Sequence, residues 1–474
     1  MIGKSLNRTN VIWSFNSAGL NEEHIEQIAE SDVDSVRLVG LGSDVKEIVK
    51  NTKALKERFA AKGKTVPVLV DMQRVARCVI SNLKEPITLT GDTTLSLTPP
   101  GKGGDLELEC TDWESFFEKG VLVYLGNAAA TLMPESIEKD LVRARIIQGG
   151  QVEPHMFAHC PLTRQPMRLE KDFLKDLYAY GESAVDGVIV PCLSTTEDML
   201  QLKNELKKSS NSAPWIFIRI DTEVAFSKLK DFIPYIKGVL ISRLELGMCM
   251  DPAKVPMMTK EIIQLCNNNA KIVMVASDIL ASMRHNATPT RAEVSDIANA
   301  TLDGADGVVL SKELAMGKYA SRGLNLAKMT IANIEAQPHF SSINWVKHSP
   351  TIDHTLAAVT YSAYRTAQRN KAKGLVCLTN KGNTALLLAS FRSNIPILAV
   401  TFKEEVLRRL SLIRGVRGML LNEAPNIDDV LPEINKYIVK KTWLESGDKI
   451  VFVSVSLSSI GEKASNLLTV QTLQ

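Results

Sequence analysis

Eight short runs of hydrophobic, mostly β-branched residues recur along the first 335 residues, and stretches with helical periodicity separate them. Most of these runs are almost continuously apolar, which is the pattern of parallel strands that are covered on both faces. The runs are residues 11–15, 35–40, 66–72, 187–192, 215–221, 238–245, 271–278 and 307–313. Eight strand and helix units in this order predict a closed parallel (β/α)8 barrel.

Two of the intervening helices have recognisable starting points. Asn21 stands directly before Glu22, and an asparagine in this position is expected to cap a helix. Ser194 and Glu197 have the spacing of a capping box, which predicts that another helix begins at Ser194.

The connection between the third and the fourth run is much longer than the others and does not have a helical pattern. Its apolar and polar residues alternate in short segments that Gly, Pro and Asp separate, which predicts a small all-β domain at residues 74–157. Ligands bind at the carboxyl ends of the strands in such barrels, so the inserted domain would cover the site as a lid.

A third unit is predicted after the barrel. A helical stretch near residues 355–368 leads to five apolar runs, at 375–379, 395–401, 418–421, 449–455 and 467–472. These elements predict a separate α/β domain, called the tail domain below. The expected division is a barrel of residues 1–73 and 158–338, a lid of 74–157 and a tail domain of 339–474.

Composition narrows the class of protein. The net charge of +3 over 474 residues, without a Lys/Arg block, excludes nucleic acid as the expected partner. The chain has no run of 18 apolar residues, so no membrane segment is expected. Seven scattered cysteines without a CxxC pair predict neither a disulfide framework nor a zinc site, and they fit a reducing, cytoplasmic location.

One long motif resembles a known family. Residues Pro289–Ser311 read PTRAEVSDIANATLDGADGVVLS, which resembles the barrel signature of the pyruvate kinase family almost residue for residue. Ala276–Leu280 is similar to that family's Ala-Thr-Gln-Met-Leu, and Cys377–Thr379 is similar to part of its C-terminal domain. The resemblance spans nearly the whole chain. It implies phosphoryl transfer from phosphoenolpyruvate to ADP, giving pyruvate and ATP, a reaction that depends on positioned cations.

The resemblance implies a set of site residues. Arg37 matches the family's phosphate-contacting arginine, and the alternative is a rim arginine that is paired to a carboxylate. Arg219 stands at the family's catalytic lysine and keeps its charge, but not its compact shape. Ser277 replaces a threonine that contacts substrate, and Ser311 matches a serine near the path of enolate protonation.

Two carboxylates match the family's divalent metal ligands. Asp221 replaces a Glu, and Glu245 replaces an Asp. Such a pair suits Mg²⁺ or Mn²⁺ that retains waters, although the exchanged lengths move the ion. The alternative is that both carboxylates pair with the neighbouring arginines, Arg219 and Arg243.

Several positions depart from the family. Its potassium ligands are Asn, Ser, Asp and Thr, of which only Asp71 remains, because Val39, Leu41 and Met72 replace the others. A hard cation cannot use apolar side chains, so the potassium site is expected to be lost.

Other departures from the family lie at positions that contact the substrate. Cys78 aligns with a substrate-side arginine of the family, for which Arg74 or Arg77 is the alternative cation. Leu244 replaces a glycine that lies where the backbone approaches the substrate carboxylate.

The sequence therefore predicts a divergent pyruvate kinase homologue with strongly reduced or no activity, retained as a structural or regulatory subunit. The alternative is a working enzyme with potassium-independent kinetics. Because family members form tetramers, we expect a homo-tetramer or a mixed oligomer with a paralogue.

Overall fold

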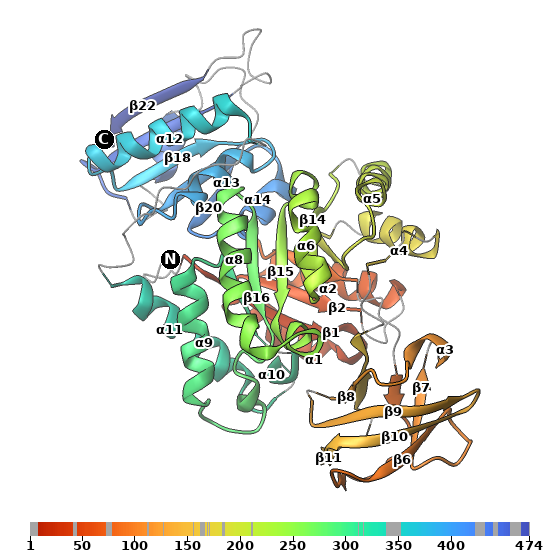
Figure 1. The fold of residues 1–474 in the computed structure, drawn as a ribbon. Helices are drawn as coiled ribbons and strands as arrows, with labels where there is room; N and C mark the ends of the chain where they lie inside the picture. The colour runs from red at the N-terminus through yellow and green to blue at the C-terminus, as the bar shows by residue number, and fades with distance from the viewer. Residues whose placement is uncertain are drawn as a thin grey trace.

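The chain forms three units, a central barrel, an inserted β domain and the tail domain (Figure 1). The structure is a computed structural model. It describes residues 8–40, 45–72, 78–110, 113–126, 128–154, 156–161, 166–167, 169, 171–182, 185–209, 212–310, 312–315, 317–337, 352–421, 432–438, 444–455 and 466–473.

The central unit is a closed parallel barrel, as predicted. Its strands follow the order β1-β17-β16-β15-β14-β13-β3-β2, and the pairing of Asn10 with Gly307 begins the contact that joins the first strand to the last. Their bounds are β1 Asn10–Asn16, β2 Ser35–Val39, β3 Val68–Asp71, β13 Gly187–Val190, β14 Trp215–Ile220, β15 Gly238–Ser242, β16 Ile272–Ala276 and β17 Gly307–Leu310. Nearly every residue of these strands is buried, which explains their continuous apolar runs.

Helices cover the outside of this barrel (Figure 1). They are α1 Glu22–Glu30, α2 Val45–Ala61, α4 Lys171–Glu182, α5 Thr196–Ser209, α6 Glu223–Phe232, α8 Val255–Asn268, α9 Arg291–Asp303 and α11 Ala320–Glu335, with the shorter α7 Arg243–Cys249 and α10 Lys312–Ala315. Asn21 caps α1, because its side chain accepts a hydrogen bond from the backbone N–H of His24, as expected.

The predicted start of the helix near Ser194 is wrong by one residue. Thr195 caps α5, since its hydroxyl accepts a hydrogen bond of 3.1 Å from the backbone N–H of Asp198. The hydroxyl of Ser194 instead donates to the carbonyl of Pro166. Two adjacent hydroxyl residues compete for this cap, and tertiary contact decides between them.

The inserted unit is a second closed barrel, in the order β10-β6-β7-β4-β12-β8-β9. It comprises β4 Cys78–Ile80, β6 Thr94–Thr98, β7 Leu106–Cys110, β8 Val123–Leu125, β9 Ala130–Glu138, β10 Leu141–Gln148 and β12 Phe157–His159, with the separate pair β5 Ile87–Leu89 and β11 Gly150–Val152 and the short helix α3 Trp113–Phe116. The alternating segments at residues 86–90, 94–98, 105–110 and 120–126 indicated four of these strands, β5 to β8, whereas the long hairpin of β9 and β10 was missed. The unit follows β3, so it is attached at the carboxyl ends of the barrel strands.

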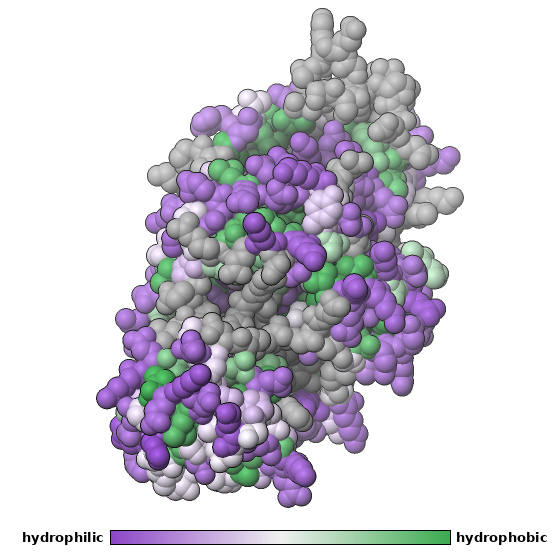
Figure 2. Space-filling model, turned by 90° about the vertical axis from the view of Figure 1, so that its right-hand side faces the viewer, coloured by the Kyte–Doolittle hydropathy of each residue, from purple (hydrophilic) through white to green (hydrophobic). Residues whose placement is uncertain are grey.

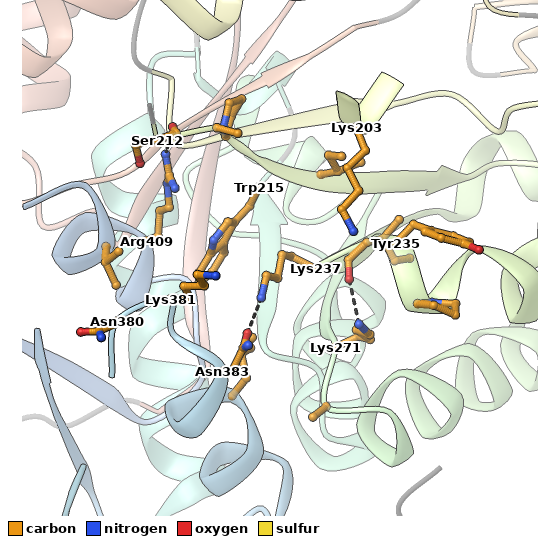
Figure 3. Close-up of a pocket in the computed structure, with 18 of the residues that line it drawn as sticks. Lys203, Ser212, Trp215, Tyr235, Lys237, Lys271, Asn380, Lys381, Asn383 and Arg409 are labelled. Carbon is orange, nitrogen blue, oxygen red and sulfur yellow. Dashed lines mark hydrogen bonds between the residues drawn. The ribbon is translucent and has the colours of Figure 1, made fainter. Parts of the chain in front are cut away.

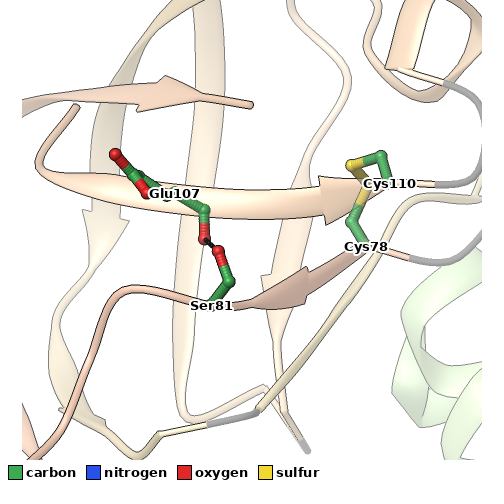
Figure 4. The surroundings of a disulfide bond; sticks show 4 residues. All are labelled: Cys78, Ser81, Glu107 and Cys110. Carbon is green, nitrogen blue, oxygen red and sulfur yellow. Dashed lines mark hydrogen bonds between the residues drawn. A yellow bond between two sulfur atoms is a disulfide. The ribbon is translucent and has the colours of Figure 1, made fainter. Parts of the chain in front are cut away.

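A disulfide joins Cys78 on β4 to Cys110 on β7 (Figure 4). The expectation of no disulfide framework, drawn from the cysteine spacing, missed this bond. The two residues are direct partners on antiparallel strands, with their Cα atoms 4.0 Å apart. Pairing across a sheet brings together cysteines that are 32 residues apart, and local spacing does not report it.

The tail domain contains one five-stranded sheet, as predicted, in the order β20-β19-β18-β21-β22. Its elements are α12 His354–Arg369, β18 Gly374–Leu378, α13 Asn383–Ser390, β19 Ile397–Thr401, α14 Glu404–Leu410, β20 Val416–Leu420, β21 Lys449–Ser454 and β22 Leu467–Thr472. The antiparallel strand β22 forms one edge of the sheet.

The tail domain packs against the amino ends of the barrel strands. Arg408 forms an ion pair of 3.0 Å with Asp186, which directly precedes β13. Arg392 contacts both carboxylate oxygens of Asp306, which directly precedes β17. One hydrophobic cluster also runs from the barrel strands into the tail domain. The lid and the tail domain therefore lie at opposite ends of the barrel.

None of the helices in the described ranges is both long and apolar enough to cross a bilayer. On the face shown in Figure 2, hydrophobic residues form small patches among hydrophilic ones.

Candidate active site

Two arginines and one aspartate form a buried cluster at the carboxyl ends of β2, β3 and β14. Asp71 is the last residue of β3 and is completely buried. Arg37 on β2 donates a hydrogen bond of 2.9 Å from Nε to Oδ2 of Asp71 and one of 3.1 Å from a terminal nitrogen to the hydroxyl of Ser14. Arg219 on β14 forms an ion pair with Oδ1 of the same carboxylate. A single carboxylate thus holds two guanidinium groups.

The side chain of Arg219 is 1% exposed. Burial lowers its pKa to about 10, while the charge of Asp221 raises the pKa and the charge of Arg37 lowers it further. The group therefore keeps its positive charge at neutral pH, because this pKa still lies well above 7. The burial of such a charge requires partners, and Asp71 provides the direct one.

Asp221 and Glu245 lie on the same side of the barrel mouth as Arg219. Asp221 directly follows β14 and is buried, and both carboxylates raise the pKa of Arg219. The prediction of a strand over residues 238–245 is wrong at its end, because β15 ends at Ser242 and Glu245 lies in the first turn of α7. Glu245 accepts a hydrogen bond of 3.4 Å from the hydroxyl of Ser277.

Ser277 lies in a turn with an unusual backbone. Its φ is +83°, and φ is also positive at Asp278 and Leu280, a conformation that residues other than glycine rarely adopt. Arg243 holds this turn, because its guanidinium donates to the carbonyl oxygens of Ala276 at 3.2 Å and Ser277 at 2.9 Å. Such strained residues concentrate at functional sites.

Arg243 also makes two hydrogen bonds of 2.9 Å to the carboxylate of Asp296 on α9. Arg243 is therefore paired with Asp296. The alternative considered from the sequence was that it pairs with Asp221 or Glu245. We did not assign Arg243 a positioning role from the sequence. Two signals for this role were available in the sequence: Arg243 directly follows a barrel strand, and Asp296 lies inside the long motif.

The residues around Asp71 do not fit a potassium site. Val39 is completely buried and Met72 is nearly so, and neither side chain has an oxygen to offer. The one remaining carboxylate is occupied by two guanidinium groups.

Asp221 and Glu245 do fit a divalent ion. The described part of the chain contains no group of three or more His, Cys, Asp or Glu residues that could hold a metal. Mg²⁺ is nevertheless often bound by one or two carboxylates together with waters and substrate phosphates. Asp221 and Glu245 are the residues that would hold it.

Four residues that the sequence singled out lie outside the described residues, namely Ser311, Leu41, Arg74 and Arg77. Leu244 is half-buried in the first turn of α7, next to Glu245.

Comparisons with known proteins agree with the architecture. A family model described as the pyruvate kinase barrel domain matches residues 6–357, and one described as the pyruvate kinase alpha/beta domain matches residues 357–471. The chain belongs to the pyruvate kinase family. The resemblance inferred from the long motif is thereby confirmed.

Curated relatives and a solved structure extend the family assignment. A pyruvate kinase of Clostridium perfringens is 30% identical over 69% of this chain and 70% of its own length. A pyruvate kinase of Sporosarcina psychrophila is 25% identical over 95% of this chain and 78% of its own length. A crystal structure of a pyruvate kinase from Cryptosporidium parvum covers 99% of this chain and 97% of its own, with a TM-score of 0.81 and 23% identity, which supports the fold.

Proposed function

We propose that this chain is a pyruvate-kinase-type protein with strongly reduced phosphoryl transfer from phosphoenolpyruvate to ADP, retained as a cytoplasmic structural or regulatory subunit. The observation that carries this proposal is the ion pair between Arg219 and Asp71. Arg219 stands where the family has its catalytic lysine, and one guanidinium cannot both neutralise Asp71 and follow the transferred phosphoryl group.

The charges at the barrel mouth support the same conclusion. Asp71, Asp221 and Glu245 lie close to Arg219, and the one remaining potassium ligand of the family, Asp71, is paired with Arg37 and Arg219. Without the potassium ion, the site therefore has one positive charge fewer than a family site that holds it. The transition state of the reaction carries spread negative charge, so this loss should slow the reaction. A divalent ion on Asp221 and Glu245 would supply further positive charge beside the phosphoryl group when bound.

The remaining residues still suit an anion. Arg37 is held in place by Asp71 and Ser14, so its guanidinium is oriented before any ligand arrives. Ser277 and Glu245 are also held together at the same rim. Weak binding of phosphoenolpyruvate with slow turnover is the expected behaviour.

A coupled assay of pyruvate formation tests this proposal, with an intact family member measured alongside. The rate should be lower by at least ~10³-fold, since one lost electrostatic stabiliser costs ~10²–10³ and further losses in one site do not simply multiply. Restoring the family residues in one variant (Arg219→Lys, Leu244→Gly, Val39→Asn, Leu41→Ser and Met72→Thr) should raise the rate and make it depend on potassium. Turnover above ~10 s⁻¹ in the unchanged protein, near the enzyme median, would overturn the proposal.

The same ion pair favours a second candidate function, a working pyruvate kinase that does not need potassium. Arg219 places a fixed positive charge next to Asp71, the one remaining potassium ligand of the family. In that case the unchanged protein would show substantial turnover without potassium, and Arg219→Lys would lower it. Slow turnover that is insensitive to this change would exclude the second candidate.

A further inference from the structure

A pocket lies between the barrel and the tail domain, at the end of the barrel opposite the candidate active site (Figure 3). Its volume is about 570 Å³, so it admits small molecules. The barrel lines it with the residues just before β14, β15 and β16, and the tail domain covers it with the loop after β18 and one side of α14. We call it the junction pocket.

Strand pairing in the barrel places two lysines of this pocket side by side. Lys237 directly precedes β15 and Lys271 directly precedes β16, and the register of these parallel strands pairs Gly238 with Ile272. Neighbouring strands lie about 4.7–4.9 Å apart, so the two side chains leave the barrel as close neighbours. The ammonium group of Lys271 reaches the carbonyl of Ile236, the residue before Lys237, at 2.9 Å. The barrel itself therefore crowds two ammonium groups together.

Further cations line the junction pocket. Seven of its described lining residues are Lys or Arg, whereas two are acidic. Lys203 comes from α5 of the barrel, and Lys381 and Arg409 come from the tail domain (Figure 3). Each of these positive charges disfavours the charged form of a lysine nearby.

Neutral groups hold the side-chain nitrogen of Lys237. This nitrogen donates to the amide oxygen of Asn383 at 2.5 Å, a contact that joins the barrel to the tail domain (Figure 3). It also lies 5.5 Å from the centre of the Trp215 ring. An amide oxygen accepts a hydrogen bond from an amine as well as from an ammonium group. Asn383 therefore positions the nitrogen of Lys237 in either protonation state.

Lys237 is a weak base as a result. Burial, together with the charges of Lys271, Lys203, Lys381 and Arg409, lowers the pKa of Lys237 to about 7. A large fraction of its amine is thus unprotonated at neutral pH, where an ordinary lysine is almost fully charged. Lysines with this property act as nucleophiles. The side chain is half-buried, so a small molecule in the pocket can reach it.

From this geometry we infer that Lys237 is a modification site for carbon dioxide, at which its side-chain amine reversibly forms a carbamate. The lone pair of Nζ attacks the carbon of carbon dioxide and forms a C–N bond, while the electron pair of one C=O π bond moves onto oxygen. The nitrogen then loses one proton to water. The products are a carbamate anion and one proton, and no oxidant or reductant takes part.

The charges around Lys237 favour this product over other adducts of lysine. A carbamate replaces a crowded cation by an anion, so the charges of Lys271 and Lys203 change from repelling the side chain to attracting it. Acetylation would instead give a neutral amide and leave the other cations uncompensated. The anion would also attract Lys381 and Arg409 of the tail domain. Carbamate formation at this site does not require the proposed phosphoryl transfer.

Chemical trapping tests this inference on the full chain. The protein is incubated with isotope-labelled bicarbonate at about pH 7.5, carbamates are ethylated with triethyloxonium, and peptides are analysed by mass spectrometry. Label should appear on Lys237 at least ~10-fold above exposed Lys53 and Lys230, because an ordinary lysine is only ~10⁻³ unprotonated at this pH. The α-amino group, with an ordinary pKa of ~7.7–8.0, is the positive control for trapping. Label on the α-amino group without label on Lys237 would overturn the inference.

A nearly isosteric variant tests the role of the neutral partner. Asn383→Asp places a carboxylate beside the amine and should hold its proton, since an opposite charge in contact shifts a pKa by ~1–3. The label on Lys237 should therefore fall at least ~10-fold. Asn286→Asp, at an exposed position elsewhere, is the matched control and should leave the label unchanged.

A second pair of variants tests the cations. Lys271→Gln with Lys203→Gln removes two charges that disfavour the ammonium form and stabilise the carbamate, so the label on Lys237 should fall at least ~3-fold. The control Lys53→Gln with Lys230→Gln removes two exposed lysines and should leave the label unchanged. Circular dichroism establishes that each variant is folded. Label on Lys237 that neither Asn383→Asp nor the cation variant lowers would overturn the role of the pocket.

The modification should also depend on pH. Carbamate forms from the unprotonated amine, so at constant dissolved carbon dioxide the label on Lys237 should rise as the pH rises from about 6 to about 8. In Asn383→Asp this rise should move to higher pH. The charged groups that line the pocket around Lys237 are Lys203, Lys207, Lys271, Lys381, Lys403, Arg409, Asp353 and Glu405. A label that does not change over this pH range would contradict a weakly basic amine at Lys237.

Discussion

Among single residues, Asp71 has the largest influence on the candidate site. Its carboxylate is completely buried and contacts Arg37 and Arg219 from opposite oxygens. A buried charge cluster of this kind contributes little net stability compared with a well-packed apolar core, but the removal of one member leaves the others uncompensated. The identity of residue 71 therefore matters for folding as well as for chemistry.

The substitution Asp71→Asn should lower the free energy of unfolding by ~3–5 kcal/mol, because two buried guanidinium groups would lose their common counter-ion. Urea denaturation followed by circular dichroism measures this change. The matched control Glu26→Gln removes one carboxylate from an exposed ion pair with Lys62 and should have little effect. A loss below ~1 kcal/mol for Asp71→Asn would contradict the buried cluster.

Metal binding is a second prediction for single residues. Asp221→Asn combined with Glu245→Gln should weaken Mn²⁺ binding by at least ~10-fold, since no described His, Cys, Asp or Glu completes a larger metal cluster. Electron paramagnetic resonance of free Mn²⁺ measures the affinity. The exposed pair Glu223→Gln, Glu261→Gln is the charge-matched control. Undiminished binding in the first variant would place the ion elsewhere.

Among the secondary-structure elements, the end of each barrel strand determines the direction of the following side chains. β15 stops at Ser242 and α7 begins at once, which places Glu245 in a helical turn beside Ser277. In the lid, the first strand, β4, is joined to β7 by the disulfide between Cys78 and Cys110.

The disulfide should stabilise the lid. Cys110→Ser should lower the stability of the oxidised protein by ~3 kcal/mol, as a cross-link between residues 32 positions apart restricts the unfolded chain. Thermal unfolding with and without dithiothreitol measures the effect. The reductant should abolish the difference between Cys110→Ser and the unchanged protein. Cys266 is buried and is not part of a disulfide, so it is the comparison residue at which the reductant should have no effect. Equal unfolding temperatures before reduction would contradict the prediction.

The whole molecule combines two ends with different chemistry. The lid and the candidate active site lie at the carboxyl ends of the barrel strands, and the tail domain lies at the amino ends. The outer helices also present apolar side chains to solvent. Leu302 on α9 is 58% exposed and Met329 on the contacting helix α11 is 61% exposed.

These exposed side chains support the prediction of an oligomer. Light scattering at micromolar concentration should give a mass above the 52.1 kDa of one chain. Leu302→Glu with Met329→Glu should shift the mass towards the monomer, because charges in an apolar contact are costly. Ile137→Glu on the lid, which is 42% exposed, is the control. A single monomer mass for the unchanged protein would contradict the prediction.

Much of the fold could be predicted because hydrophobic periodicity is a local property. All eight barrel runs became strands, and the five tail runs became one sheet. The boundaries of helices and strands were predicted less accurately, as the helix start near Ser194 and the end of β15 illustrate. The hairpin of β9 and β10 was missed, although its strands form the largest part of the lid sheet.

The sequence by itself determined the barrel, the tail domain and the family, since these follow from repeated apolar runs and one long motif. It also determined that oxygen ligands are lacking at Val39 and Met72. Only the tertiary structure decided that Arg219 pairs with Asp71, that Cys78 meets Cys110 and that lysines from two domains share one pocket. The physical reason is that ion pairs, disulfides and pockets join residues far apart in the chain, and their partners are fixed only when the barrel closes and the domains dock.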